Sequence, residues 1–303
     1  MPKAIITGAA GFAGYSTTRE LLNRGYEVYA ILRPGSAHNR RLNALSGNLH
    51  RIELDCSDFD KISDFVYDTP DLFFHLAWFG DRNDKKVQDE NIDDCIKALE
   101  SSSRLKCRRF IGIGSQAEYG ICSDVINEET TPEPFSAYGA AKLAAMNLSH
   151  KSADELGIEW VWGRIFSLYG DREPHGRMLP DLIRSLRMNA DIYLSSCEQY
   201  WDYLHVTDGA KAIVSIGESG HAGEVYNIAS GDYKPLKEFT EEAKELFGYR
   251  GKIRYGDKAD PFVSLKPDIS KIKEHTGWTP VISFNEGVLR FADEEDQYND
   301  SLL

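Results

Sequence analysis

Residues 136–145 read SAYGAAKLAA and place a phenol and an amine about one helical turn apart. Tyr138 and Lys142 are separated by four positions, so both side chains project from the same face of a helix. A phenol can exchange a proton, and a nearby ammonium favours its phenolate. The same spacing also suits an ordinary solvated helix face. Taken alone, the pair leaves a proton-transfer site and a plain surface helix both open.

A glycine-rich stretch, TGAAGFAG, follows a short β-rich run and precedes a helix expected over residues 15–25. Its glycines have the spacing GxxGxxG. The first permits a tight turn, the second lets the backbone approach a pyrophosphate, and the third lets helix and strand pack closely. The helix N-terminus then faces the anion, which predicts a dinucleotide site; a tight turn without a ligand is the alternative. The predicted cofactor-binding residues of this loop are Gly8, Gly11, Phe12, Ala13 and Gly14.

The end of the strand expected at 26–33 indicates which dinucleotide binds. An acid at this point would bind the ribose of NAD, but the chain has Ile31, Leu32 and Arg33. With no carboxylate to repel a 2′-phosphate, Arg33 can pair with it, and Arg40 or Arg41 can add charge. We therefore expect NADP in preference to NAD. A merely solvated Arg33 is the alternative.

The next expected strand, at 49–55, ends in a second group of candidate cofactor contacts. Asp55 and Cys56 stand where they can contact the adenine. Asp55 also suits the cap of a following helix, because a carboxylate accepts hydrogen bonds from the free N–H groups there.

Strands and helices alternate along the first half of the chain. Further strands are expected at 71–78, 108–115 and 159–167, and the segments 58–66 and 89–104 look helical. This alternation predicts an α/β fold, a Rossmann-like doubly wound parallel sheet with a smaller mixed α/β cap that binds the substrate. The expected domains are residues 1–168 for the dinucleotide, with return segments from about 204–230, and an interleaved unit at 169–303 for the substrate.

Composition excludes several classes of function. The net charge of −13, from 48 acidic and 35 basic residues, argues against nucleic acid as a partner. The five cysteines form no CxxC and the eight histidines no HExxH, so we expect reduced thiols and no metal site. No signal peptide precedes the first strand, and no apolar run approaches the ~20 residues that span a bilayer. The expectation is a cytoplasmic protein with no membrane partner.

Several motifs together resemble the extended short-chain dehydrogenase/reductase family, in particular its nucleotide-sugar epimerases, dehydratases and reductases. They are TGAAGFAG, HLAW, GSQAEYG, YGAAK, GRIFSLYG and WDYLHVTD, and the resemblance covers nearly the whole chain. It implies that Tyr138 exchanges a proton with a sugar oxygen while nicotinamide exchanges hydride with the same carbon. It also implies that Lys142 binds the nicotinamide ribose and that Ser115 hydrogen-bonds the reacting oxygen. Ala77 aligns with a cofactor-contacting position, with plain packing as the alternative.

The first departure from the family pattern concerns elimination chemistry. The 4,6-dehydratases carry an Asp-Glu pair directly after the Ser/Thr, where this chain has Gln116 and Ala117. Neither side chain exchanges a proton as a carboxyl does, so we expect no dehydration. Gln116 remains a candidate substrate contact. Ser167 and Phe166 also align with substrate-facing positions, although Phe166 suits the core better.

The second departure concerns the substrate pyrophosphate, which two arginines of the family usually hold. Trp201 replaces one of them, and Lys266 stands in place of the other as a point charge without a bidentate fork. Trp201 can stack on a base or sugar, or fill the cap core. Arg177 can supply the missing charge, or it is a surface arginine.

These observations predict an NAD(P)-dependent enzyme that acts at C4 of a nucleotide-linked hexose. NADPH-dependent 4-keto reduction is the first reading, because Arg33 favours NADP and net reduction commonly uses NADPH. A UDP-glucose 4-epimerase-like activity is the alternative, and a non-catalytic NADP-sensing protein is a remote one. The resemblance also implies a homodimer formed through the helices at 88–104 and 137–155.

Overall fold

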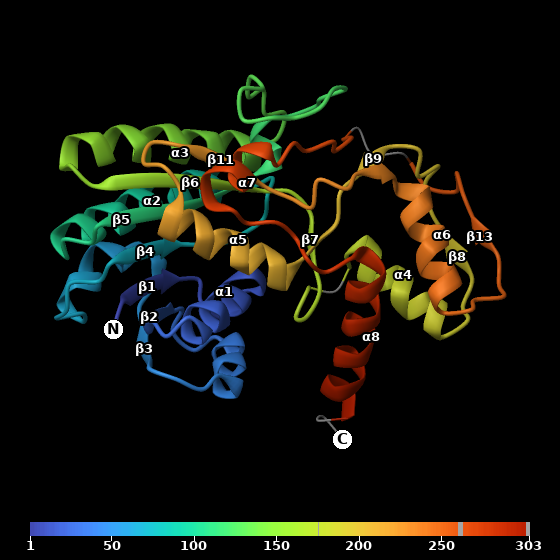
Figure 1. Ribbon diagram of the computed structural model, residues 1–303, viewed down its shortest axis with the longest axis horizontal. Helices are drawn as coiled ribbons and strands as arrows, with labels where there is room; N and C mark the ends of the chain where they lie inside the picture. Colours follow the sequence, from blue (N-terminus) through green and yellow to red (C-terminus); the bar gives the residue numbers. More distant parts are fainter. Residues whose placement is uncertain (175, 260–262, 301–303) are drawn as a thin grey trace.

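The computed structural model describes residues 1–174, 176–259 and 263–300, with side chains described as far as Asp293. Its centre is a seven-stranded sheet in the order β11-β6-β5-β4-β1-β2-β3 (Figure 1). Every neighbouring pair in it is parallel, which confirms the predicted α/β class. The strands are β1 (Lys3–Thr7), β2 (Glu27–Leu32), β3 (Leu49–Glu53), β4 (Leu72–His75), β5 (Arg109–Ser115), β6 (Glu159–Ile165) and β11 (Val225–Ile228).

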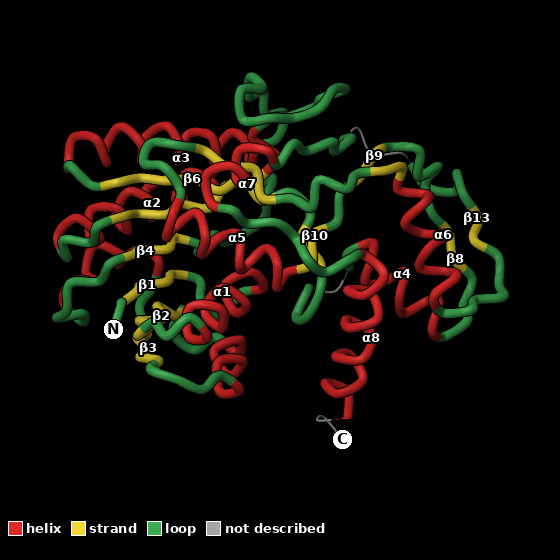
Figure 2. Tube along the Cα trace, in the orientation of Figure 1, coloured by secondary structure: helices red, strands yellow, loops and turns green. Residues whose placement is uncertain are grey.

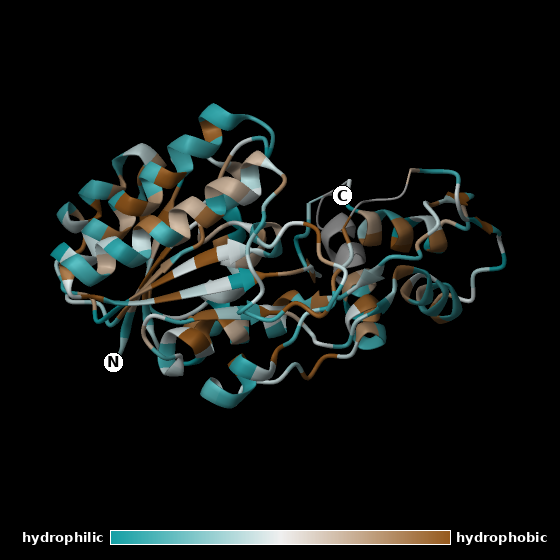
Figure 3. Ribbon diagram, turned by 90° about the horizontal axis from the view of Figure 1, so that it is seen from above, coloured by the Kyte–Doolittle hydropathy of each residue, from teal (hydrophilic) through white to brown (hydrophobic). Residues whose placement is uncertain are grey.

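Both faces of the sheet are buried, as a parallel sheet requires. On β1, Ala4 and Ile6 enter one core while Ile5 enters the other. The helices α1 (Phe12–Asn23), α5 (Val206–Ser219) and α7 (Ser270–Thr276) cover the first core. The other core lies under α2 (Lys85–Arg104), α3 (Ala137–Leu156) and the 3-10 helix η2 (Cys56–Asp64). Figure 3 shows apolar strands enclosed between helices whose outer faces are hydrophilic.

The strand order reverses beside β1, and this reversal places the ligand crevice. From β1 the chain adds β2 and β3 on one side, and then crosses to β4, β5 and β6 on the other. Ligands of such sheets bind outside the carboxyl ends of the strands at this point. Gly8 follows β1, Ala77 follows β4, and Ser115 ends β5. Three of the predicted site residues therefore lie at the carboxyl ends of neighbouring strands.

A smaller cap lies beside the sheet, at the right of Figure 1. It contains α4 (Met178–Arg187), α6 (Leu236–Leu246) and α8 (Phe284–Asp300). Short strands pair as β8 (Ile192–Tyr193) with β13 (Ile253–Arg254), and β9 (Tyr200–Trp201) with β12 (Lys234–Pro235). Loops connect most of these pieces (Figure 2). A separate apolar core holds them together, including Leu182, Ile183, Phe239, Val288 and Phe291.

The chain enters the cap after β6 and later returns to the sheet. At the crossing, β7 (Leu168–Tyr169) pairs with β10 (Leu204–His205). Directly after β10 the chain forms α5 and then β11, which pairs with β6 at the sheet edge. Elements separated by the cap in sequence are thus packed together.

Two predicted helical segments differ from the structure. The segment 58–66 belongs to a 3-10 helix, η2, which begins earlier, at Cys56. The first helix begins at Phe12 rather than at residue 15, because the glycine loop itself forms its N-terminus. Within the described ranges, we find no helix long and apolar enough to cross a membrane.

Candidate active site

The glycine loop is packed against the end of β4. Gly8 has φ of +71°, and a Cβ at this position would lie 2.7 Å from the backbone nitrogen of Ala77. The Ala77 N–H donates to Thr7 Oγ1 at 3.3 Å, so the two strand ends are tied together. A Cβ on Gly14 would overlap the carbonyl oxygen of Gly8. Only glycine fits such close approaches of backbone to backbone.

The same loop places the N-terminus of α1 near the carboxyl end of β1. Gly11 precedes the helix, and its N–H donates to the Gly8 carbonyl oxygen at 2.9 Å. Phe12 and Ala13 open the helix, so their N–H groups have no acceptor within it and can donate to an anion. The cradle that lacks Cβ atoms and these free N–H groups fit the pyrophosphate of a dinucleotide.

Positive charge gathers at the end of β2, the position where folds of this type commonly distinguish NAD from NADP. Arg41 and Arg33 both lie near His38, and together with burial they lower the pKa of that imidazole. Arg41 also donates to the carbonyl oxygen of Ala10 at 3.3 Å, which brings it to the glycine loop. Arg33 and Arg40 are exposed. This part of the site can meet a 2′-phosphate with cations.

A carboxylate that the sequence reasoning missed lies beside these cations. Glu53 pairs in register with Leu32, the last residue of β2. Asn39 bridges the two strands, because its Nδ2 donates to the Arg33 carbonyl at 3.0 Å and to Glu53 Oε1 at 3.2 Å. The acid absent from the end of β2 is therefore present on the neighbouring strand, a position that parallel pairing reveals and sequence order does not.

Asp55 and Cys56 follow β3. Asp55 caps η2, accepting from the Ser57 backbone N–H at 3.1 Å and its hydroxyl at 3.0 Å. The structure thus gives Asp55 the capping role that was the alternative to an adenine contact. Burial raises the pKa of the Cys56 thiol to about 12, so Cys56 is neutral at physiological pH.

Ser115 and Tyr138 meet where β5 ends and α3 begins. Ser115 caps a short 3-10 helix, η3 (Gln116–Glu118), and its Oγ accepts from the Ala117 N–H at 3.2 Å. Tyr138 lies in the first turn of α3, which Ser136 caps. Burial raises the pKa of the Tyr138 phenol, while a hydrogen bond with the Ser115 side chain lowers it. The structure brings these two predicted residues into contact.

Lys142 shares the helix but is turned inward. Its Nζ donates to the carbonyl oxygen of Ile113 at 2.7 Å and lies 3.6 Å from the centroid of the Trp78 ring. The residue is buried, and burial lowers the pKa of its ammonium to about 7. Trp78 also meets Tyr138 edge-on, with ring centroids 6.3 Å apart. Trp78 therefore contacts both predicted catalytic side chains, which the motif HLAW did not indicate.

A second residue missed by sequence reasoning faces the phenol from outside. The Arg82 guanidinium carbon lies 4.6 Å from the centroid of the Tyr138 ring, and the Arg82 carbonyl accepts from the Tyr138 N–H at 3.2 Å. Arg82 lies in an exposed loop after β4 with no motif around it. Nothing in its sequence context marks it as part of the site.

A buried ion pair supports the site from beneath. Glu118 and Arg164, with side chains 0% and 2% exposed, pair at 2.8 Å. The other carboxylate oxygen of Glu118 accepts from the Ser115 N–H at 2.9 Å and from Trp162 Nε1 at 3.1 Å. The guanidinium of Arg164 also stacks on Tyr119, 4.3 Å from the ring centroid. This network fixes the backbone from which the Ser115 hydroxyl projects.

The candidate substrate residues are distributed between the two parts of the molecule. Gln116 and Ser167 are half-buried at the strand ends, whereas Phe166 is buried among apolar residues, as its alternative reading required. Arg177 precedes α4, is exposed, and lies close enough to lower the pKa of Tyr138. Lys266 donates to the Ser123 carbonyl at 2.8 Å and lies 4.5 Å from the Tyr200 ring centroid.

Trp201 lines a cavity of about 560 Å³ in the cap. Its indole Nε1 is buried without a hydrogen-bond partner in the part of the chain that the structure describes. Asp181 and Asp191 also line the cavity, and Lys258 is its basic lining residue among those described. The cavity is therefore lined in part by an aromatic side chain whose indole N–H has no partner among the described residues.

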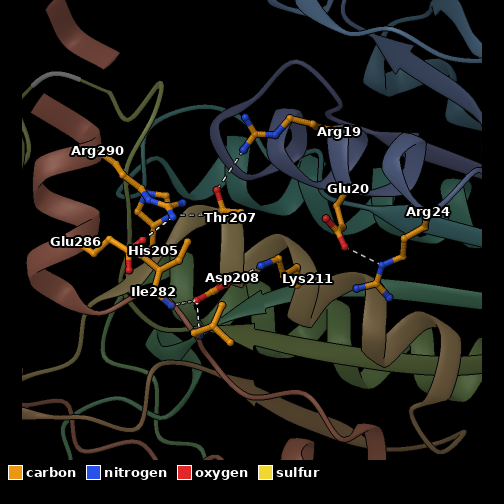
Figure 4. A network of polar contacts seen from close by, with 11 residues as sticks. Arg19, Glu20, Arg24, His205, Thr207, Asp208, Lys211, Ile282, Glu286 and Arg290 are labelled. Atoms are coloured by element: carbon orange, nitrogen blue, oxygen red, sulfur yellow. Dashed lines mark hydrogen bonds and ion pairs between the residues drawn. The ribbon is translucent and has the colours of Figure 1, made fainter. Parts of the chain in front are cut away.

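The motif WDYLHVTD joins the cap to the sheet through backbone hydrogen bonds. The Asp202 carboxylate accepts from the N–H groups of Ser230 and Gly231 at 2.9 and 2.8 Å. Asp208 accepts from the Val281 and Ile282 N–H groups, both at 2.7 Å. Figure 4 shows Asp208 in a polar network where α1, α5 and α8 approach one another. These acids hold segments in place rather than face the cavity.

Comparisons with known proteins agree with this geometry. The family model for the NAD dependent epimerase/dehydratase family matches residues 4–229. UDP-glucuronic acid decarboxylase 1 of Arabidopsis thaliana is 26% identical over 307 residues, covering 96% of this chain and 69% of that protein.

Two solved structures are similar over nearly the whole chain. UDP-glucose 4-epimerase of Thermotoga maritima, with UDP-glucose, is 25% identical with a TM-score of 0.86, covering 98% of this chain and 99% of that one. UDP-glucuronic acid 4-epimerase of Bacillus cereus, in complex with NAD, is 25% identical with a TM-score of 0.85, covering 98% of each.

Proposed function

Because the chain belongs to the NAD dependent epimerase/dehydratase family, we propose that it is an NAD(P)-dependent 4-epimerase of a nucleotide-linked hexose. The observation that carries the proposal is the contact of Ser115 with Tyr138. This contact lies at the carboxyl ends of the strands, where the glycine loop also lies. A proton-transfer pair beside a dinucleotide cradle suits hydride and proton exchange at one carbon. When bound, the nicotinamide would supply the hydride acceptor and donor.

The protein groups divide the remaining tasks. The glycine loop would hold the coenzyme pyrophosphate, with Phe12 and Ala13 donating backbone N–H groups. Tyr138 would take the proton of the C4 hydroxyl and return it, while Ser115 would orient the same oxygen. Lys142 would bind the nicotinamide ribose with the N–H bonds that its contact with Ile113 leaves free.

Epimerisation fits better than the 4-keto reduction predicted first from the sequence. The two solved structures named above are 4-epimerases, and these comparisons do not support a reductase. Reduction remains a second candidate because Arg33 and Arg41 support NADP. Glu53 supports NAD instead, since a carboxylate repels a 2′-phosphate. The two reactions differ in their net use of coenzyme. An epimerase regenerates its coenzyme at each turnover, whereas a reductase consumes NADPH.

Dehydration lacks the required groups. Gln116 and Ala117 occupy the positions of the acid pair, and neither carries a carboxyl. Glu118 follows directly, but its carboxylate already accepts from Arg164, Trp162 and the Ser115 N–H. These three donors use the Glu118 carboxylate inside the protein, so it is not available to a substrate.

The cap would bind the nucleotide part of the substrate. Trp201 lines the cavity, with an indole N–H that has no partner among the described residues, and Arg177 is an exposed cation close enough to affect Tyr138. Together they would replace the arginine that the family resemblance places at position 201. The substrate would then span from the cavity to the phenol.

A second copy of the chain would pair through α2 and α3. The two helices pack on each other, and a groove between them is lined by small residues of α3, among them Ala137, Ala140 and Ala144. Small side chains allow close approach of another helix. This proposal continues the dimer expected from the family resemblance.

The decisive experiment compares Tyr138→Phe with wild type. We expect turnover of UDP-linked hexoses to fall by about 10²–10⁴-fold, the range of general acid–base catalysis, because the phenol oxygen is the only group removed. Coenzyme affinity, titrated with NAD and NADP separately, should stay within about twofold. Product isomers and nicotinamide absorbance, followed together, distinguish epimerisation from net reduction.

Tyr67→Phe is the matched control, because Tyr67 is 93% exposed and precedes β4, whereas the site residue Ala77 follows it. It should leave turnover unchanged. Undiminished turnover in Tyr138→Phe would remove Tyr138 from the reaction, and a wild-type protein without turnover that still binds coenzyme would favour the sensing protein.

A further inference from the structure

Arg82 lies on the loop between β4 and α2, against the ring of Tyr138. Its guanidinium carbon is 4.6 Å from the ring centroid, and its carbonyl oxygen accepts from the Tyr138 N–H at 3.2 Å. The backbone bond attaches the loop to the first turn of α3 whatever side chain occupies position 82. The guanidinium can therefore be replaced without removing this attachment.

The second observation concerns the charge of Arg82. Among the described residues, its guanidinium forms no ion pair with a carboxylate. The adjacent acids are occupied elsewhere: Asp81 accepts from the Asn83 N–H at 2.7 Å, and Asp84 caps α2. A guanidinium also keeps its charge throughout the pH range in which proteins are folded. A permanent cation thus faces the phenol ring.

Lys142 does not supply an equivalent charge. Its Nζ is directed to the Ile113 carbonyl and lies over the Trp78 ring, at 2.7 Å and 3.6 Å respectively. Burial lowers the pKa of this ammonium to about 7, so its charge depends on pH, unlike that of a guanidinium. The lysine therefore offers hydrogen bonds and a pH-dependent charge, whereas Arg82 offers a charge that does not depend on pH.

The other charged or titratable groups that face Tyr138 do not replace Arg82. Ser115 contributes a hydrogen bond and Arg177 a more distant cation, and both lower the pKa of the phenol. Glu118 raises that pKa, although its carboxylate is paired with Arg164. Arg82 has the largest charge effect among these neighbours.

We propose that Arg82 is a positioning residue that holds a permanent positive charge over the Tyr138 ring and favours its phenolate. Its charge adds to any that the Lys142 ammonium, one turn along α3, contributes to the same phenolate. This inference rests on the proposed function, since a phenolate serves proton abstraction from a hydroxyl. Because Arg82 is exposed, its influence also depends on ionic strength.

The test is a direct titration of Tyr138 by NMR with ¹³Cζ-tyrosine, in the free protein and with NAD or NADP bound. The Tyr138 resonance is assigned by its absence from Tyr138→Phe. In Arg82→Gln we expect the measured pKa of Tyr138 to rise by about one pH unit, the lower end of the effect of an adjacent opposite charge. Arg82→Lys should give a smaller rise, because the charge remains but the planar stacking is lost.

Two controls keep the result specific. Arg104→Gln removes an exposed cation in the last turn of α2 and should leave the Tyr138 titration unchanged. Raising the salt concentration to about 1 M, where the Debye length is about 3 Å, should shrink the difference between wild type and Arg82→Gln. Under the proposed function, the pH–rate profile has an apparent pKa on its acid side that reports Tyr138. In Arg82→Gln this apparent pKa should rise by the same amount as the pKa measured by NMR.

An unmoved Tyr138 titration in Arg82→Gln overturns the inference, even if the enzyme epimerises a nucleotide sugar. A titration that moves as expected supports it, even if no tested nucleotide sugar is turned over, in which case the proposed function fails alone.

Discussion

The sheet and the cap contribute polar groups to the crevice in different ways. In the sheet, Glu118 and Arg164 are buried and fully paired, and they hold the backbone of Ser115. In the cap, Trp201 has a buried indole N–H without a partner among the described residues, and Arg177 is exposed. The sheet thus preorganises Ser115, whereas Trp201 and Arg177 in the cap keep polar groups that the described residues do not engage.

The largest expected effect is a loss of unfolding free energy when the buried ion pair beside the sheet is broken. Glu118→Ala leaves the Arg164 guanidinium buried and unpaired, which should cost about 3–5 kcal/mol of unfolding free energy. Chemical denaturation followed by circular dichroism measures this loss. Glu100→Ala removes an exposed partner of Arg104 at 3.8 Å and should cost no more than about 0.5 kcal/mol. Similar losses in both variants would show that the buried network contributes little.

A second effect in the sheet depends on pH. Burial lowers the pKa of His75 to about 3, below its ordinary value of 6.5. Between these values the unfolded chain binds a proton that the folded protein excludes, so stability falls as pH falls below 6.5. One such group contributes a slope of about 1.4 kcal/mol per pH unit.

His75→Gln should remove this contribution to the slope, and unfolding free energies measured between pH 6 and pH 4 test the expectation. Measurements at pH 8, where His75 is neutral in both states, isolate the cost of the substitution itself. An identical slope in wild type and variant at acid pH would mean that His75 is protonated in the folded protein.

The smallest expected effect is in the cap and should leave the fold untouched. Trp201→Phe keeps an aromatic ring in the cavity and removes the free N–H. If this group donates to the substrate, KM for the nucleotide sugar should rise about threefold to tenfold, the value of one net hydrogen bond. Coenzyme affinity and the melting temperature should not change. A variant with unchanged KM, or with lowered stability, would place Trp201 in the core of the cap instead.

The sequence was informative wherever a local pattern carries the physical requirement. The glycine spacing follows from backbone contacts within one βα turn, and the alternation of apolar strands with helices predicts a parallel sheet. Asp55 illustrates the limit of such patterns, because a carboxylate before a helix suits both a cap and a ligand contact. The structure shows the cap.

By itself, the sequence determined the α/β class, the glycine loop and the separation of Tyr138 from Lys142 by one helical turn, because these depend on residues near one another in the chain. Only the tertiary structure decided that Lys142 turns toward Ile113, that Arg82 covers the phenol and that Glu53 lies beside Arg33. Such contacts form when parallel pairing brings the carboxyl ends of separate strands together. Their energy depends on distance in space, and no spacing along the chain records it.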